Sequence, residues 1–155
     1  MNTLRRAFAG AATAWPVGIM LATVVASRPQ SQVSTAGYAF ALAMYAAGSL
    51  ICHQRPERSF HLLGAQMPVC ARCAGIYAGA AVAAGVSWLR TLHGSRHLRR
   101  LDPGTAIRVL LVSALPAAGT LLYEWTTGHT PGNWMRLTSG VPLGATAAWV
   151  LLRVN

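Results

Sequence analysis

The sequence has little charge, and almost none of it is negative. Only 10% of its 155 residues are charged and lysine is absent, whereas about 25% of residues are charged in a typical soluble domain. The three acids, Glu57, Asp102 and Glu124, argue against acid–base catalysis by a pair of carboxylates. The low polar content also excludes a disordered chain, because disordered segments are polar. A soluble domain of this composition would have too little polar surface to cover itself.

Apolar residues make up 54% of the chain, and they gather in runs without Asp, Glu, Arg or His. A helix needs about 20 apolar residues to cross a bilayer. Five runs approach or reach that length: Ala7–Ser27, Ala36–Cys52, Ala74–Leu89, Val109–Tyr123 and Leu137–Leu152. None shows the alternation of a strand. The sequence therefore predicts a single all-α membrane domain over residues 1–155, a polytopic bundle of four to five transmembrane helices.

The first run has two interpretations. Arg5 and Arg6 followed by an apolar stretch also resemble a secretory signal peptide. The run is longer than the apolar part of such a signal, which is about 7–15 residues. Its length therefore favours a retained helix.

The net charge of +10 comes from 13 arginines. They lie at the ends of the apolar runs and in the loops, where arginine typically holds a helix end among lipid headgroups. No basic face interleaved with aromatic residues is present. We therefore expect the lipid bilayer as a partner and no nucleic acid. Five short helices enclose little space, so a transport pathway would require a homo-oligomer.

All three cysteines fall within 22 residues, beside two neighbouring apolar runs. Cys52-His53 ends the second run and Cys70-x-x-Cys73 begins the third, so antiparallel packing of the two helices would bring four soft ligands together. Three cysteines and one histidine are a common ligand set for tetrahedral zinc. We therefore predict a metal site of Cys52, His53, Cys70 and Cys73, with zinc as the expected ion. Iron and copper(I) also accept thiolates.

Other interpretations of these residues stay open. His61 lies in the same loop and can take the place of His53. Cys70 and Cys73 also resemble the redox pair of a quinone-linked thiol oxidoreductase, although one cysteine is left over. Cysteines can equally be small apolar packing residues. Four protein ligands would indicate a structural metal, whereas three ligands and a water would indicate a metalloenzyme acting on a lipid phosphate or another anion.

A second predicted site consists of charged side chains at the ends of apolar runs, close to the membrane interior. Arg72 lies between two of the candidate ligands, and Glu124 follows the fourth run with Thr120 one turn before it. Ionisable groups in a membrane are usually paired inside the bundle, which predicts an Arg72–Glu124 pair. Arg72 can also extend to lipid headgroups. Together with Arg58 and Tyr77, the pair is expected to line an anion-binding pocket beside the metal.

Gly75-x-x-x-Gly79 in the third run predicts a close contact with another helix, because glycines one turn apart let two backbones approach. Asn133 and Arg136 precede the last run, and residue type alone assigns them no role.

The cysteine-rich stretch resembles a family of small prokaryotic membrane proteins, domain of unknown function 2085. The family signature runs Cys-His-Gln, then Arg-Ser-Phe, then Pro-x-Cys-x-Arg-Cys-x-Gly-Ile-Tyr-x-Gly. This sequence matches it at Cys52-His53-Gln54, at Arg58-Ser59-Phe60 and from Pro68 to Gly79.

The resemblance extends over the last two-thirds of the chain. Asn133, Arg136 and Gly140 fit a further Asn-x-x-Arg-x-x-x-Gly step. Thr120 and Glu124 stand where the family usually has Asp and Gln, so the acid has moved by one turn. The resemblance implies a multi-pass protein of the prokaryotic inner or cytoplasmic membrane, and it implies no settled activity.

Overall fold

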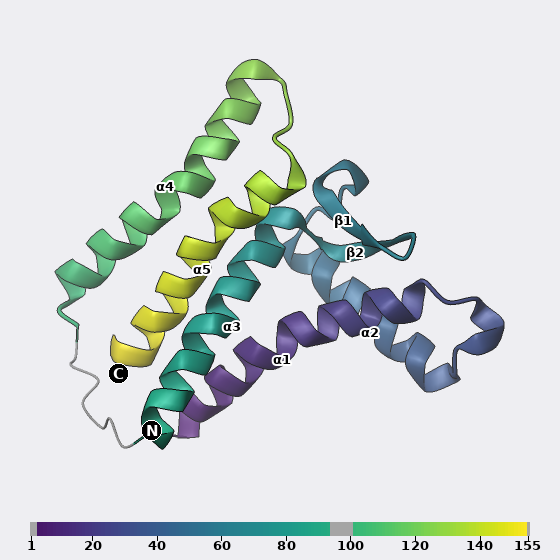
Figure 1. Cartoon of the computed structure of the whole chain (residues 1–155), viewed down its shortest axis with the longest axis horizontal. Coiled ribbons are helices and arrows are strands. Elements are labelled where there is room, and N and C mark those ends of the chain that lie inside the picture. The colour runs from purple at the N-terminus through teal and green to yellow at the C-terminus, as the bar shows by residue number, and fades with distance from the viewer. Residues whose placement is uncertain (1–2, 94–100, 155) are drawn as a thin grey trace.

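The computed structural model describes residues 3–93 and 101–154. Within these residues the chain forms five α-helices and a short β-hairpin (Figure 1). Helices α1 (Thr3–Ala26) and α2 (Thr35–Ile51) precede the hairpin, and α3 (Ala71–Leu92), α4 (Pro103–Thr127) and α5 (Asn133–Val154) follow it. The predicted all-α class is confirmed, and each helix covers most or all of one predicted apolar run.

Local signals explain where the helices begin and end. The Ser34 hydroxyl accepts a hydrogen bond from the Gly37 N–H (3.2 Å) at the start of α2. The Asp102 carboxylate accepts one from the Thr105 N–H (3.1 Å) at the start of α4. Gly128 ends α4 in the left-handed conformation (φ 69°), which glycine adopts without a steric penalty.

The hairpin corrects the expectation that the chain contains no strand. Strand β1 (Ser59–Leu62) pairs antiparallel with β2 (Ala65–Cys70). Leu63 and Gly64 form the turn with positive φ angles of 53° and 83°, as a tight two-residue hairpin turn requires. Three consecutive residues of β2 are buried, from Met67 to Val69. Because both faces of the strand are covered there, its sequence lacks the alternation that would have revealed it.

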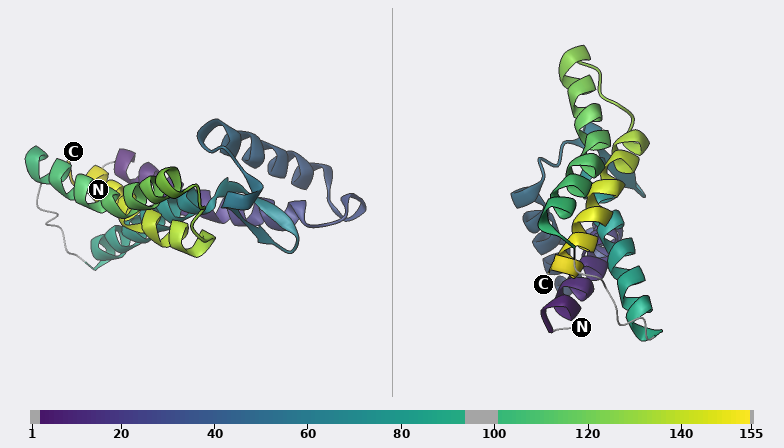
Figure 2. Two further views of the ribbon diagram at one scale, coloured as in Figure 1. Left: turned by 90° about the horizontal axis from the view of Figure 1, so that it is seen from above. Right: turned by 90° about the vertical axis from the view of Figure 1, so that its left-hand side faces the viewer.

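Helices α1 and α2 form one group and α3, α4 and α5 form a second (Figures 1 and 2). The hairpin connects the two groups along the chain. Helices α3 and α5 lie side by side and run in the same direction, and α4 runs antiparallel to α5. Helix α1 packs against α3 and β2, and α2 returns along α1 to contact β2. The N-terminal ends of α3 and α5 therefore lie near the hairpin (Figure 1). Glu124, in the last turn of α4, is linked to the same region by its ion pair with Arg58.

Glycines on both helices allow α3 and α5 to touch. A Cβ added at Gly75 or Gly79 would overlap a backbone carbonyl of α5, and one added at Gly140 or Gly144 would overlap a backbone carbonyl of α3. The close contact predicted from Gly75 and Gly79 is confirmed. The matching glycine pair on α5 was not anticipated.

Helix α4 has the character of a membrane span. Both α1 and α4 are long and apolar enough to cross a bilayer, and only 22% of the apolar window of α1 and 6% of that of α4 is buried. A core helix of a soluble protein would be mostly buried. A signal peptide near the N-terminus would have the same composition as α1. Helix α4 is therefore the stronger evidence for a membrane span. Its exposed side chains include Ile107, Leu111, Val112, Leu115 and Leu122, an apolar surface suited to lipid.

The apolar core beside the hairpin holds the thiols in place. Ile19 of α1 and Met67 and Val69 of β2 are its buried members. Cys52 and Cys73 pack against them. The positions of these cysteines are thus set by packing between α1, β2 and the adjoining helix ends.

Candidate metal centre and buried charge cluster

Three thiols meet beside this core. Cys52 follows the last residue of α2, Cys70 ends β2 and Cys73 lies in the first turn of α3. All three are free, and their Sγ atoms lie within 4.8 Å of one another. A Zn–S bond of about 2.3 Å places the sulfurs of a tetrahedral site about 3.8 Å apart. A small contraction of the three sulfurs therefore gives a donor set that fits a soft metal ion.

Hydrogen bonds join the end of α2 to β2 at this point. The Cys70 N–H donates to the Cys52 sulfur (3.1 Å). The side-chain amide of Gln54 donates to the carbonyls of Tyr45 in α2 and Pro68 in β2, each at 2.8 Å. The hairpin and these bonds, more than direct packing of α2 on α3, bring the cysteines together.

The surroundings of Cys70 favour its thiolate form. Hydrogen bonds to its sulfur, foremost from the Cys73 side chain, lower the pKa of Cys70 to about 5 against the opposing effect of burial. The thiolate is the form that binds metals and attacks disulfides. Cys70 is therefore prepared for either chemistry at neutral pH.

The predicted fourth ligand, His53, does not join the sulfurs. Among residues 3–93 and 101–154, the group of candidate ligands at this site consists of the three cysteines alone. His53 is exposed, because Cys52 is extended and Gln54 is left-handed (φ 46°), so the chain turns away from the core between them. His61, the predicted substitute, is exposed on β1. The structure thus brings three of the four predicted ligands together and leaves His53 apart from them.

The second predicted site is a buried carboxylate among arginines. The side chain of Glu124 is 5% exposed. Its Oε1 lies 2.7 Å from Arg58 Nη2 and 2.6 Å from Arg136 Nη2, and its Oε2 lies 3.9 Å from Arg72 Nη2. The predicted pairing of Arg72 with Glu124 is confirmed. Arg136 was left without a role by the sequence, although it makes the shortest of these contacts.

Thr120 completes the surroundings of Arg72. Arg72 Nη2 donates to Thr120 Oγ1 (3.0 Å), and the Thr120 hydroxyl lies 3.4 Å from that of Ser139 on α5. Positions 120 and 124 of α4 both face Arg72. An acid at either position of this helix would therefore lie near the same guanidinium.

Asn133 anchors the start of α5 to the hairpin. Its side-chain amide donates to the Ser59 carbonyl (3.0 Å), and the rings of Phe60 and Trp134 make an edge contact at 5.1 Å. Arg136 follows one turn later and is thereby aimed at Glu124. The spacing of Asn133 and Arg136 places them on one helix face, a signal that becomes readable once residue 133 is known to begin the helix.

The structure does not bring Tyr77 to the charges. Tyr77 lies five residues after Arg72, so it is turned about 140° from it around α3. Its ring packs edge-on against Trp15 at 6.0 Å. Tyr77 lines an apolar cavity of about 380 Å³ together with Pro16, Phe60, Met67, Ala74, Trp134 and others. It belongs to the thiol side of α3.

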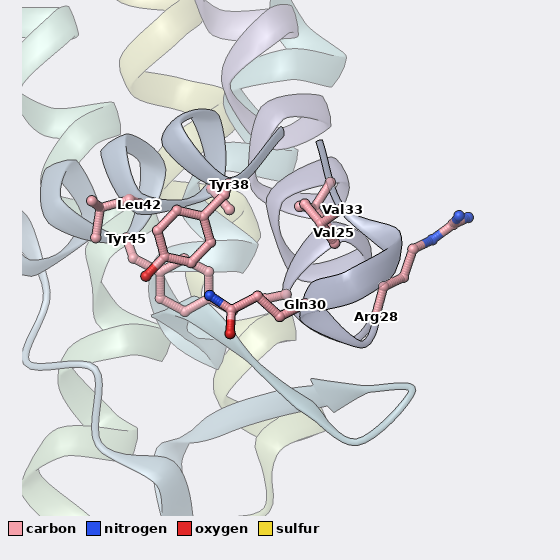
Figure 3. A pocket seen from close by; sticks show the side chains of 9 residues that line it. Val25, Arg28, Gln30, Val33, Tyr38, Leu42 and Tyr45 are labelled. Carbon is pink, nitrogen blue, oxygen red and sulfur yellow. The ribbon is translucent and has the colours of Figure 1, made fainter. Parts of the chain in front are cut away.

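A further cavity, of about 510 Å³, lies between the end of α1 and the start of α2 (Figure 3). Tyr38 and Gln30 face each other across it, whereas Arg28 extends away from it. Tyr45 also lines the cavity, and its hydroxyl donates to the Gln66 carbonyl of β2. None of the predicted site residues is among those that line it.

Comparison with known proteins gives a family match and two relatives that are similar over short segments. The family model described as "Predicted membrane protein (DUF2085)" matches residues 52–150. An uncharacterized protein of Methanocaldococcus jannaschii is 58% identical over 41 residues, which are 26% of each chain. One of Methanothermobacter thermautotrophicus is 60% identical over 30 residues, 19% of this chain and 27% of the relative. The chain thus spans about a quarter of these relatives, and no solved structure matches it.

Proposed function

We propose that this chain, which belongs to the family of predicted membrane proteins called domain of unknown function 2085, is a multi-pass membrane protein that binds a soft metal ion on Cys52, Cys70 and Cys73. The observation that carries the proposal is the convergence of the three Sγ atoms within 4.8 Å. These are all the cysteines of the protein, and they come from the ends of α2 and β2 and the start of α3.

The membrane part of the proposal is that the five described helices make four to five spans in a prokaryotic inner or cytoplasmic membrane. The exposed apolar surface of α4 supports it. The distribution of charge supports it too, because Arg72, Glu124 and Arg136 lie near ends of α3, α4 and α5 that their ion pairs join. The opposite ends of the same three helices carry Arg90, Arg108 and Arg153. Charged side chains at both ends of α3, α4 and α5 are what helices reaching two membrane faces would show.

Zinc is the ion that we expect at the site. Three thiolates form part of its common tetrahedral ligand sets, and copper(I) and iron are the competing ions because they also accept thiolates. A bound ion would cross-link the ends of α2 and β2 to α3 and, with three protein ligands, could keep one position for water or an anion. Cys70, with its lowered pKa, supplies a thiolate without the help of a base.

A second candidate function is oxidation of the Cys70/Cys73 dithiol by a quinone, and the apolar cavity of about 380 Å³ favours it. Ala74 and Tyr77, which follow Cys73 on α3, line this cavity. Oxidation of Cys70 and Cys73 would form one S–S bond and release two electrons and two protons. A quinone bound in the cavity would accept them and leave as a quinol.

Elemental analysis of the full chain, purified in detergent without a metal-affinity tag, tests the proposal. We expect about one metal ion per chain in the wild type, because the site offers one set of three thiolates. Cys52→Ser, Cys70→Ser and Cys73→Ser should each lose most of it. His53→Ala is the matched control and should retain the metal, because His53 lies outside the group of ligands.

The same preparation separates the alternatives when its free thiols are counted. Absence of metal, with two thiols blocked until a reductant is added, would overturn the metal site in favour of the redox pair. Loss of metal from His53→Ala would overturn the three-cysteine ligand set in favour of the four-ligand site.

A further inference from the structure

The cluster around Glu124 is out of charge balance. Of the residues that the structure describes, three guanidinium groups lie within 4 Å of this one carboxylate. The exposed carboxylate of Glu57 lies 4.0 Å from Arg58 Nε, so the cluster carries an excess of one positive charge when both carboxylates are ionised. An uncompensated charge removed from water is costly. A bound anion would therefore stabilise this cluster of arginines.

Burial and unsatisfied hydrogen bonding point to the same conclusion. The side chain of Arg136 is 2% exposed, and its Nε and Nη1 atoms are buried without a hydrogen-bond partner. The Nε atoms of Arg58 and Arg72 are also buried and unpartnered. Each unmade hydrogen bond of a buried donor carries its own desolvation penalty. Four N–H donors from three arginines are thus available to one acceptor-rich ligand.

We propose that Arg58, Arg72 and Arg136 bind a phosphate group beside Glu124. Guanidinium forks match phosphate oxygens in geometry and make strong charge-assisted hydrogen bonds with them. A phosphate monoester or inorganic phosphate carries between one and two negative charges near neutral pH, which is enough to offset the excess. The proposal does not depend on the metal site, because its donors and its charge are independent of the thiols.

The phosphate has two routes to this site. Arg58 and Arg72, with side chains 32% and 20% exposed, open the cluster to the solution. A groove of about 490 Å³ between α4 and α5 reaches Thr120 and Ser139, and Thr120 accepts the hydrogen bond of Arg72. The phosphate group can therefore be that of a lipid headgroup or of a soluble molecule.

Thermal unfolding of the full chain in a maltoside detergent tests the site, with inorganic phosphate as the probe and chloride at equal ionic strength as the reference. We expect a saturable rise in Tm with phosphate alone. Arg58→Gln should weaken the apparent affinity about tenfold or more, and its partly exposed position allows the variant to fold. Arg28→Gln removes the same charge from the α1–α2 connection, so it should leave the affinity unchanged.

Glu124→Gln should change the effect of phosphate in the direction opposite to Arg58→Gln, by strengthening it. The substitution removes the carboxylate that competes for the arginines, so phosphate should raise Tm more in this variant than in the wild type. A role of the arginines in stability alone predicts no such gain. If phosphate instead stabilises wild type, Arg58→Gln and Arg28→Gln equally, the proposal is wrong.

Vesicles separate the two sources. The protein is reconstituted in phosphatidylcholine alone or mixed with phosphatidic acid, and the Tm shift is compared between wild type and Arg58→Gln. A wild-type response to inorganic phosphate assigns a soluble ligand, and a response to phosphatidic acid alone assigns a headgroup. Absence of an Arg58-dependent response to either probe would overturn the proposal.

Discussion

At the residue scale, Gln54 shows how one side chain fixes the thiol site. Its amide nitrogen donates to carbonyls of α2 and β2, and its own carbonyl accepts from the Gln66 side chain (2.5 Å). Its φ of 46° is uncommon for a residue other than glycine. The hydrogen bonds on both sides hold this conformation. Gln54 thereby connects Cys52, two residues earlier, to the strand that ends in Cys70.

We predict that Gln54→Ala lowers both stability and metal occupancy. Loss of two hydrogen bonds, each contributing about 1 kcal/mol, should reduce the free energy of unfolding by about 2 kcal/mol. Cys52 also loses its fixed position, so the metal content per chain should fall. The exposed Gln32 provides the matched control, since Gln32→Ala should change neither quantity. Unchanged stability and metal content in Gln54→Ala would show that the hairpin alone positions Cys52.

At the element scale, the contact between α3 and α5 positions the arginines around Glu124. The glycines at 75 and 79 and those at 140 and 144 let the helix backbones meet. This contact holds Arg72 on α3 and Arg136 on α5 at distances from which both reach Glu124 of α4. A single extra carbon at the contact would push these helices apart, because backbone carbonyls cannot move aside as flexible side chains do.

We predict opposite effects for the same substitution at two positions of α3. Gly75→Ala should destabilise the protein by about 1–3 kcal/mol, because its Cβ overlaps α5. Gly85→Ala should stabilise it by about 0.5–1 kcal/mol, because the position is open and alanine favours a helix. Unfolding in detergent measures both. Equal effects at the two positions would contradict the packing of α3 on α5.

At the scale of the whole molecule, both sites lie at one end of the group formed by α3, α4 and α5, between this group and α2 (Figure 1). The end of α2 and the starts of α3 and α5 lie near the hairpin, and the ion pair of Glu124 with Arg58 links the end of α4 to the same region. If α3 and α4 each cross the membrane, the hairpin turn and the α4–α5 loop emerge on one side and the end of α3 on the other. The thiols and the arginines then share one membrane face.

Short epitopes inserted after Gly64, Gly128 and His93 test this arrangement. In sealed vesicles, the epitopes after Gly64 and Gly128 should react with antibody from the same side, and the epitope after His93 from the opposite side. Retention of the wild-type chain in the membrane after alkaline extraction is the control for insertion. Exposure of the first two epitopes on opposite sides would contradict the proposed course of α3 and α4.

The local features of this protein were predictable from residues close together in the chain. The five helices follow from apolar runs that lack the alternation of a strand, because a helix satisfies its backbone hydrogen bonds within one such run. The contact face at Gly75 and Gly79 was also correctly predicted from their spacing. The pairing of Arg72 with Glu124, which are far apart in the chain, was predicted because ionisable groups near a membrane are usually paired. The spacing of the cysteines indicated that their sulfurs would meet, as they do.

The remaining features depend on residues far apart in the chain. The exclusion of His53 follows from backbone turns at its neighbours, and the strand β2 was hidden because it is covered on both faces. Arg136 gains its partner only when α5 packs on α3 and Asn133 binds the hairpin. The sequence by itself determined the helices and the types of ligand atom, since both follow from local composition and period. Only the tertiary structure decided that His53 lies apart from the thiols and that Arg58 and Arg136 join Glu124, because each of these placements depends on how several elements pack at once.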